Sequence, residues 1–153
     1  MKILMVCLGN ICRSPLAEGI LRKIITDHQL NWTVDSAGTG DWHVGHTPDK
    51  RSIAVAGKNG IDISTLRGRQ FSTKDFKTFD YILVMDSENY ANVIRLASNE
   101  TEKQKVELLL NYVNKGKNET VPDPYWDDSL FSPVYDLIYQ ACEHFVAFHQ
   151  PQN

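Results

Sequence analysis

Short apolar runs alternate with segments of helical periodicity along this chain, and this alternation restricts the fold more than any other feature. The run "KILMVC" (2–7) is nearly continuous in apolar residues, as expected of a strand buried on both faces. Residues 14–28 follow it with apolar side chains at helical spacing. Strands that alternate with helices predict an α/β fold, in which a parallel sheet is flanked by helices.

The remaining elements are expected from the same two patterns. Strands are predicted at 32–38, 79–86 and 105–110. A helix is predicted between Thr47 as N-cap, with Pro48 at its first position, and a glycine stop at Gly57 or Gly60. Another helix should begin at Asp86 or Ser87. The last helix, 129–149, carries its apolar stripe on Leu130, Val134, Leu137, Ile138, Ala141, Phe145 and Phe148.

Length and charge exclude several classes of protein. A chain of 153 residues suits a single domain, here 1–153, and its formal charge of −3 argues against a basic nucleic-acid-binding face. The N-terminal apolar run is interrupted by Asn10 and Arg13 too early for a signal peptide. No run approaches the roughly 18 apolar residues of a membrane span. We therefore expect a cytoplasmic protein that binds neither nucleic acid nor a membrane.

The segment "VCLGNICRSP" (6–15) lies where the first strand should end and the first helix begin. Ligands of parallel sheets bind beyond this end of the strands, and backbone N–H groups in a tight loop before a helix form an anion site. Gly9 permits the tight loop, and Arg13 offers a planar fork for two phosphate oxygens. These groups would favour a thiolate at Cys7, and Ser14 could donate a hydrogen bond to its sulfur. The segment therefore predicts a nucleophile that attacks phosphorus.

The three cysteines need different interpretations. A free cysteine is most often a small buried apolar side chain, and Cys142 fits this because it falls on the apolar stripe of the last predicted helix. Cys7 does not, since Cys, five residues and Arg-Ser-Pro between a strand and a helix form a restrictive pattern. Cys12 is compatible both with plain packing and with a resolving thiol that protects Cys7 in a disulfide.

A general acid for the leaving group is expected in a loop, and "VPDPYWDDS" (121–129) is the richest candidate. Asp123 is held between two prolines, which restricts its backbone. Tyr125 and Trp126 could supply apolar walls for an aromatic substrate. The alternative is an ordinary solvated turn.

A second loop, 38–46, follows the second strand and should lie beside the phosphate cradle. Trp42 is expected to be exposed there and to form another wall. His43 and His46 are spaced like a weak metal pair, but no third or fourth ligand is evident. We expect both histidines to be solvent-exposed loop residues, and we expect no metal.

With both loops placed, the chain resembles the low-molecular-weight protein tyrosine phosphatases over nearly its whole length. The resemblance rests on "VCLGNICRSP", on "DSAGT" (35–39), on "DYILVMD" (80–86) and on the Asp-Pro-Tyr of the acidic loop. It implies a three-layer fold, phosphotyrosine protein phosphatase I-like, whose four-stranded parallel sheet has the order 2-1-3-4.

The resemblance also implies the residue roles. Cys7 would be the nucleophile, Arg13 the phosphate clamp, and Asp123 the proton donor that later activates water. Asn10, held by Ser36, would keep the shape of the phosphate loop. The phosphate-binding residues, which could equally hold a sulfate, would be Leu8, Gly9, Asn10, Ile11, Cys12, Arg13 and Ser14. Trp42 and Tyr125 would flank the ring of a phosphotyrosine protein or a small aryl phosphate.

No cofactor is implied, and a monomer or a weak dimer is expected.

One departure concerns a histidine that braces the phosphate loop in the family. The corresponding region here reads "ISTLRGRQF" (63–71), with Thr65, so the bracing is expected to differ.

Three alternatives remain. An arsenate reductase of the same fold needs two further cysteines, of which only Cys142 is available beyond the cradle. The family's phosphoarginine branch carries threonine where this chain has Ile11, so Ile11 favours tyrosine. A non-catalytic module that senses redox state or binds phosphate would need neither Cys7 as nucleophile nor Asp123.

Overall fold

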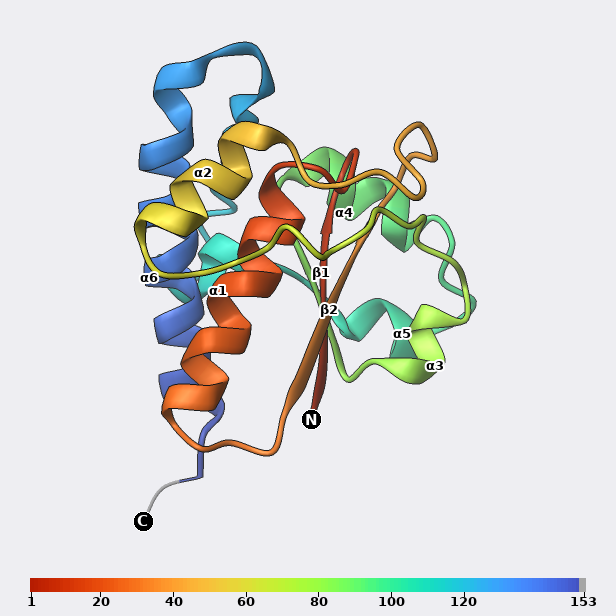
Figure 1. Ribbon diagram of the computed structural model, residues 1–153. Coiled ribbons are helices and arrows are strands. Elements are labelled where there is room, and N and C mark those ends of the chain that lie inside the picture. The colour runs from red at the N-terminus through yellow and green to blue at the C-terminus, as the bar shows by residue number, and fades with distance from the viewer. Residues whose placement is uncertain (152–153) are drawn as a thin grey trace.

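The computed structural model describes residues 1–151 and contains a four-stranded parallel sheet with the order β2-β1-β3-β4 (Figure 1). The strands are β1 (Lys2–Cys7), β2 (Thr33–Gly38), β3 (Tyr81–Val84) and β4 (Val106–Leu108). The expected strand order and parallel pairing are therefore confirmed. β1 lies between β2 and β3, so its C-terminal end is at the centre of the sheet edge where ligands bind.

Helices cover both faces of this sheet. Those of at least five residues are α1 (Arg13–Asp27), α2 (Lys50–Lys58), α4 (Ser87–Ile94), α5 (Glu100–Gln104) and α6 (Phe131–His149). A short α3 (Asp75–Thr78) and the 3-10 turns η1 (Leu109–Tyr112), η2 (Pro124–Trp126) and η3 (Asp128–Leu130) complete the elements. Figure 1 shows α1, α2 and α6 on one side of the sheet and α3, α4 and α5 on the other.

Alternate residues of β1 pack on opposite faces of the sheet, because successive side chains of a strand point in opposite directions. Ile3 and Met5 belong to the core beneath α1 and α6, whereas Leu4 and Val6 belong to the core on the opposite face. All four are fully buried. This explains why the first strand is a continuous apolar run instead of an alternating one.

The start predicted for α2 is wrong. The cap is Asp49, whose carboxylate accepts a hydrogen bond of 2.8 Å from Arg51 N, and Thr47 and Pro48 precede the helix. The backbone N–H of Asp49 donates to Ile11 O at 2.8 Å, so the chain must reach the phosphate loop before it can turn into a helix. At the other end, Gly60 adopts a φ of +78° after the helix and is the glycine stop.

Three further boundaries differ from the expectations. The strand expected at 79–86 is limited to Tyr81–Val84. The apolar run at 105–110 continues as a strand only to Leu108, after which the chain forms η1. The last helix begins at Phe131, and Cys142 is fully buried in it as expected. Phe148 is 75% exposed and does not belong to the core stripe. Within the described residues, no helix has the length and apolar character needed to cross a membrane.

Candidate active site

The loop between β1 and α1 wraps around the sulfur of Cys7. Cys7 is only 3% exposed, and its Sγ accepts a hydrogen bond from Asn10 N at 3.3 Å. Ser14 Oγ lies 3.0 Å from the same sulfur. α1 begins at Arg13, so its N-terminal end, which carries a partial positive charge, is adjacent to this sulfur. The surroundings therefore stabilise negative charge on Cys7.

Asn10 holds the loop in a conformation that few residues adopt. Its φ is +57°, in the left-handed region, and its side chain is buried. The amide Nδ2 donates to Ser14 Oγ (2.8 Å) and to Ser36 Oγ (3.0 Å). Its Oδ1 accepts from Arg69 N at 3.0 Å. A backbone N–H at 69 therefore braces this loop, within the segment 63–71 where the bracing is expected to differ.

A buried carboxyl lies behind this network. Ser36 Oγ donates to Glu18 Oε1 at 2.7 Å, and Arg22 pairs with the other oxygen of Glu18. Burial raises the pKa of Glu18, an effect that the hydrogen bonds from Ser36 and Arg22 only partly offset. A continuous chain of contacts therefore runs from Glu18 through Ser36 and Asn10 to the loop.

The end of β2 supports the loop from the side. Thr39 N donates to Cys7 O and Gly40 N donates to Leu8 O, both at 2.9 Å. A Cβ at Gly38 would lie 2.8 Å from Leu8 O, closer than Cβ atoms come to other atoms in proteins. Only glycine at this position allows β2 to approach the loop so closely.

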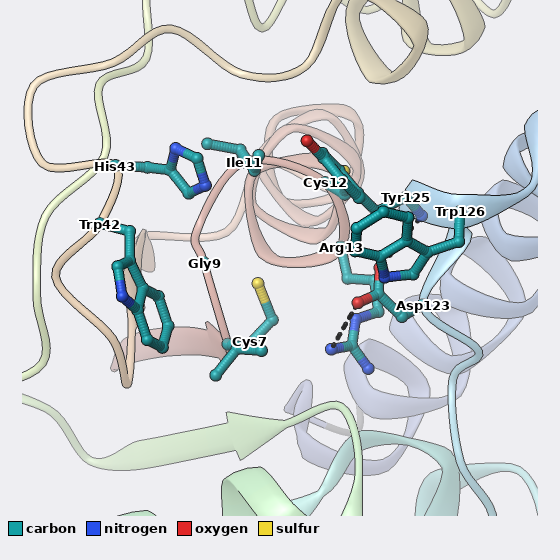
Figure 2. Close-up of a pocket in the computed structure, with 11 residues that line it drawn as sticks. Cys7, Gly9, Ile11, Cys12, Arg13, Trp42, His43, Asp123, Tyr125 and Trp126 are labelled. Carbon is teal, nitrogen blue, oxygen red and sulfur yellow. Dashed lines mark hydrogen bonds and ion pairs between the residues drawn. The ribbon is translucent and has the colours of Figure 1, made fainter.

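Arg13 joins the loop to two other parts of the chain. Its Nη1 donates to Asp86 Oδ2 at 2.7 Å and to Val121 O at 3.0 Å. Its Nη2 lies 4.0 Å from Asp123 Oδ2, the ion pair marked by the dashed line in Figure 2. Asp86 directly precedes α4 and Val121 is the first residue of the acidic loop, so Arg13 connects three segments that are distant in the sequence.

These residues enclose a cavity of about 280 Å³. Figure 2 shows the Cys7 thiol pointing into it, with Trp42 and His43 on one side and Asp123 with Trp126 on the other. The cavity is lined by Cys7, Leu8, Gly9, Ile11, Cys12, Arg13, Trp42, His43, Asp123, Tyr125 and Trp126. Asn10 and Ser14, predicted to bind substrate, do not line this cavity, and their side chains are hydrogen-bonded to each other. Ser36 supports the loop from β2 through Asn10.

In the second loop, 38–46, the exposure expected for Trp42 is confirmed, whereas that expected for His43 is wrong. Trp42 is 65% exposed at the cavity wall. His43, expected to be solvent-exposed, is half-buried, because its ring lies over Gly9 in the phosphate loop. His43 Nδ1 lies 3.2 Å from Nδ1 of the exposed His46. Across residues 1–151, no three His, Cys, Asp or Glu side chains form a group that could hold a metal ion.

Cys12 is buried and lines the cavity beside Cys7, and all three cysteines are free thiols. Burial, together with the negative charge of Asp49, raises the pKa of Cys12 to about 12. The pKa of Cys142 is also raised by burial. Both thiols therefore stay protonated near neutral pH.

Sequence reasoning missed three residues of this site. Asp86 was expected only as the start of a helix, although its place after β3 puts it at the same sheet edge as Cys7. His43 follows Trp42, and the glycine contact that draws it inward has no signature in the sequence. The third is Arg51 of α2, whose Cζ lies 5.5 Å from the Tyr125 ring centroid.

Comparisons with known proteins agree with this geometry. Residues 2–152 match the family model of the low molecular weight phosphotyrosine protein phosphatases. A human protein of that name is 43% identical over 149 residues, which cover 95% of this chain and 93% of the human protein. A crystal structure of a protein tyrosine phosphatase from Entamoeba histolytica has a TM-score of 0.89 at 39% identity, covering 96% of this chain and 95% of its own. A Drosophila arginine phosphatase has a TM-score of 0.92 at 34% identity, with both chains covered completely.

Proposed function

Because this chain belongs to the low-molecular-weight phosphotyrosine protein phosphatase family, we propose that it hydrolyses phosphotyrosine through a phosphocysteine on Cys7. One observation carries this proposal. A single cavity contains the Cys7 thiol, the Arg13 guanidinium and the Asp123 carboxyl, which come from segments more than a hundred residues apart. These are the nucleophile, the anion clamp and the acid that transfer of a phosphoryl group requires.

In the first half of the reaction, the backbone N–H groups of the loop and the fork of Arg13 bind the phosphoryl oxygens. The Cys7 thiolate attacks phosphorus, so that an S–P bond forms as the P–O bond to the aryl group breaks. Asp123 donates its proton to the departing phenolate oxygen. Trp42 and Tyr125 enclose the ring of the substrate.

In the second half, Asp123 is a carboxylate and accepts a proton from a water molecule. The water oxygen attacks phosphorus and the S–P bond breaks, which releases inorganic phosphate and restores the thiolate. Ser14 Oγ, 3.0 Å from the sulfur, stabilises the negative charge that returns to Cys7. Besides the substrate and this water molecule, these steps use only side chains and backbone groups of this chain.

The alternatives receive less support from the geometry. An arsenate reductase relay would need a mobile, accessible third cysteine, but Cys142 is fully buried in the middle of α6. The similarity to an arginine phosphatase makes phosphoarginine the appropriate competitor substrate. Aromatic walls at Trp42 and Tyr125 favour an aryl ester over it.

We further propose that the protein is a single domain that acts in the cytoplasm as a monomer or weak dimer. Free thiols at all three cysteines suit a reducing compartment. Light scattering over a range of protein concentrations would test the oligomeric state.

The test of the reaction combines two substitutions and two substrates. Cys7→Ser should abolish turnover of phosphotyrosine while phosphate still binds, and a fully active variant would refute the mechanism. Asp123→Ala should slow phosphotyrosine far more than 4-nitrophenyl phosphate, whose leaving group needs no proton. Equal losses on both substrates would show that Asp123 is not the proton donor to the leaving group. Phosphoarginine, assayed beside them, should be the poorer substrate.

A further inference from the structure

The first turn of α2 is hydrogen-bonded to the phosphate loop. Asp49 N donates to Ile11 O at 2.8 Å, and Ser52 Oγ donates to Cys12 O at 3.3 Å. Arg51 lies between these two anchors in the sequence, and its own side chain reaches the segment that follows Asp123. We propose that Arg51 is a positioning residue, which holds Tyr125 and the segment carrying Asp123 in register with the phosphate loop. This inference rests on the proposed function.

The guanidinium of Arg51 is held at both ends by carboxylates. Nε and Nη2 donate to the two oxygens of Asp49 at 3.0 and 2.9 Å, a bidentate pair on α2 itself. Nη1 donates to Asp128 Oδ1 at 2.5 Å, across to the acidic loop. Asp49 also caps the helix through Arg51 N. The side chain is therefore fixed on α2 and reaches the other loop from a rigid base.

Two aromatic rings pack against the same guanidinium. Its Cζ lies 4.6 Å from the ring centroid of Phe131 and 5.5 Å from that of Tyr125. Phe131 begins α6 and is buried, whereas Tyr125 lines the cavity. Arg51 itself is not a lining residue. It therefore acts on the site through Tyr125 and does not touch the substrate.

Pro124 of the segment 122–130 is buried and Leu130 packs against the core, but the polar residues between them have few partners outside the segment. Within residues 1–151, only Arg13 and Arg51 form side-chain ion pairs with it from outside. Its internal hydrogen bonds, such as Asp123 Oδ1 accepting from Tyr125 N at 3.1 Å, shape the turn but do not attach it to the body. Arg13 contacts the start of the segment, and Arg51 supplies the ion pair near its far end, beside the apolar contact of Leu130 with the core.

The geometry uses a property that lysine lacks. One planar group must face Asp49 with two nitrogens, Asp128 with a third and an aromatic ring with its face, which an ammonium cannot do. Arg51→Lys keeps the charge and loses this fork. If the role of Arg51 were only to attract anions to the site, lysine would restore activity fully.

The experiment compares Arg51→Met with Arg95→Met, an exposed arginine at the end of α4. Arg51→Met should lower kcat/KM for phosphotyrosine by about ten- to a hundredfold, because a small displacement of an acid has a large effect on rate. The loss on 4-nitrophenyl phosphate should be clearly smaller, and inhibition by inorganic phosphate should be unchanged. Arg51→Lys should restore the rate only in part, and Arg95→Met should match the unaltered protein.

A second readout does not need activity. Hydrogen exchange of the amides at 125–130, measured without substrate, should accelerate in Arg51→Met and, to a smaller extent, in Asp128→Asn. Asp128 has a side chain that is 84% exposed, so this variant folds regardless of the outcome. Equal losses on both substrates, full rescue by lysine or unchanged exchange would overturn the inference. If the unaltered protein has no phosphatase activity but exchange accelerates in Arg51→Met, the proposed function is wrong, while the inference that Arg51 holds the segment 122–130 is supported.

Discussion

Arg13 and Asp86 form an ion pair of 2.7 Å that joins the phosphate loop to the end of β3. Asp86 has two tasks, because its other oxygen accepts from Asn89 N at 2.8 Å and caps α4. Burial by itself would lower the pKa of Arg13, but the charge of Cys7 and the hydrogen bond to Asp86 outweigh it and raise the pKa. The guanidinium is therefore charged and oriented before a phosphate arrives.

The first prediction concerns this pair. Asp86→Asn keeps an oxygen for the helix cap and removes the charge that orients Arg13. We expect kcat/KM to fall by about ten- to a hundredfold and the inhibition constant of phosphate to rise, since a misaligned fork binds the anion less well. Competitive inhibition by phosphate measures this directly. An unchanged inhibition constant would show that Arg13 is oriented without Asp86.

The second prediction concerns the left-handed residue of the loop. Asn10→Ala removes three hydrogen bonds, two of them buried, and should lower the free energy of unfolding by about 2–4 kcal/mol. Asn10→Gly loses the same bonds but relieves the positive φ, so it should be more stable than the alanine variant by about 1 kcal/mol. Urea unfolding distinguishes the two, and activity should be lost in both.

A matched control exists at Gln29, which is exposed and has a φ of +54° far from the cavity. Gln29→Gly should leave activity intact and change stability by no more than about 1 kcal/mol. If Asn10→Gly proved as active as the unaltered protein, the side-chain network would be dispensable and the backbone alone would shape the loop.

Local patterns explain which parts of the molecule were predictable. Each of the first three elements depends on residues close together in the sequence. The apolar run specifies the strand β1, a glycine permits the loop after it, and a proline in the first turn favours the start of α1. The separate strands and the parallel sheet follow from the same alternation. The strand order came from the resemblance to a family, because apolar runs do not specify which strands are neighbours.

The rest depends on contacts between distant residues, which no local pattern contains. Asp49 caps α2 instead of Thr47, because the N–H of Asp49 donates to Ile11 O just before the helix begins. His43 turned inward because Gly9 leaves room for its ring. Arg51 gave no signal in the sequence, since its partner Asp128 is 77 residues away.

The third prediction concerns the reactivity of the cysteines. Cys12, with a pKa raised to about 12, and Cys142, fully buried, should resist alkylation near neutral pH. Iodoacetamide should add a single label, on Cys7, and phosphate should slow the reaction by occupying the loop. Mass spectrometry of digested protein identifies the site. Labelling of Cys12 at neutral pH in Cys7→Ser would contradict this.

The fourth prediction concerns Glu18, whose pKa is raised by burial above its ordinary value of 4.5. A carboxyl with a raised folded pKa binds its proton more tightly in the folded protein than in the unfolded chain. Its contribution to stability is complete below the unfolded pKa and disappears as the pH rises through the folded pKa. The stability of the unaltered protein relative to Glu18→Gln should therefore decrease as the pH rises.

Urea unfolding of both proteins between about pH 4 and pH 8 measures this difference, in which all other titrating groups cancel. Glu143→Gln, at an exposed position of α6, controls for the loss of one negative charge. A difference that increased with pH would mean that the pair with Arg22 outweighs burial and that the ionised carboxylate is the form the fold prefers. In that case Ser36, which donates to Glu18 at 2.7 Å, would be oriented by a full charge, and the phosphate loop would weaken in acid instead of in base.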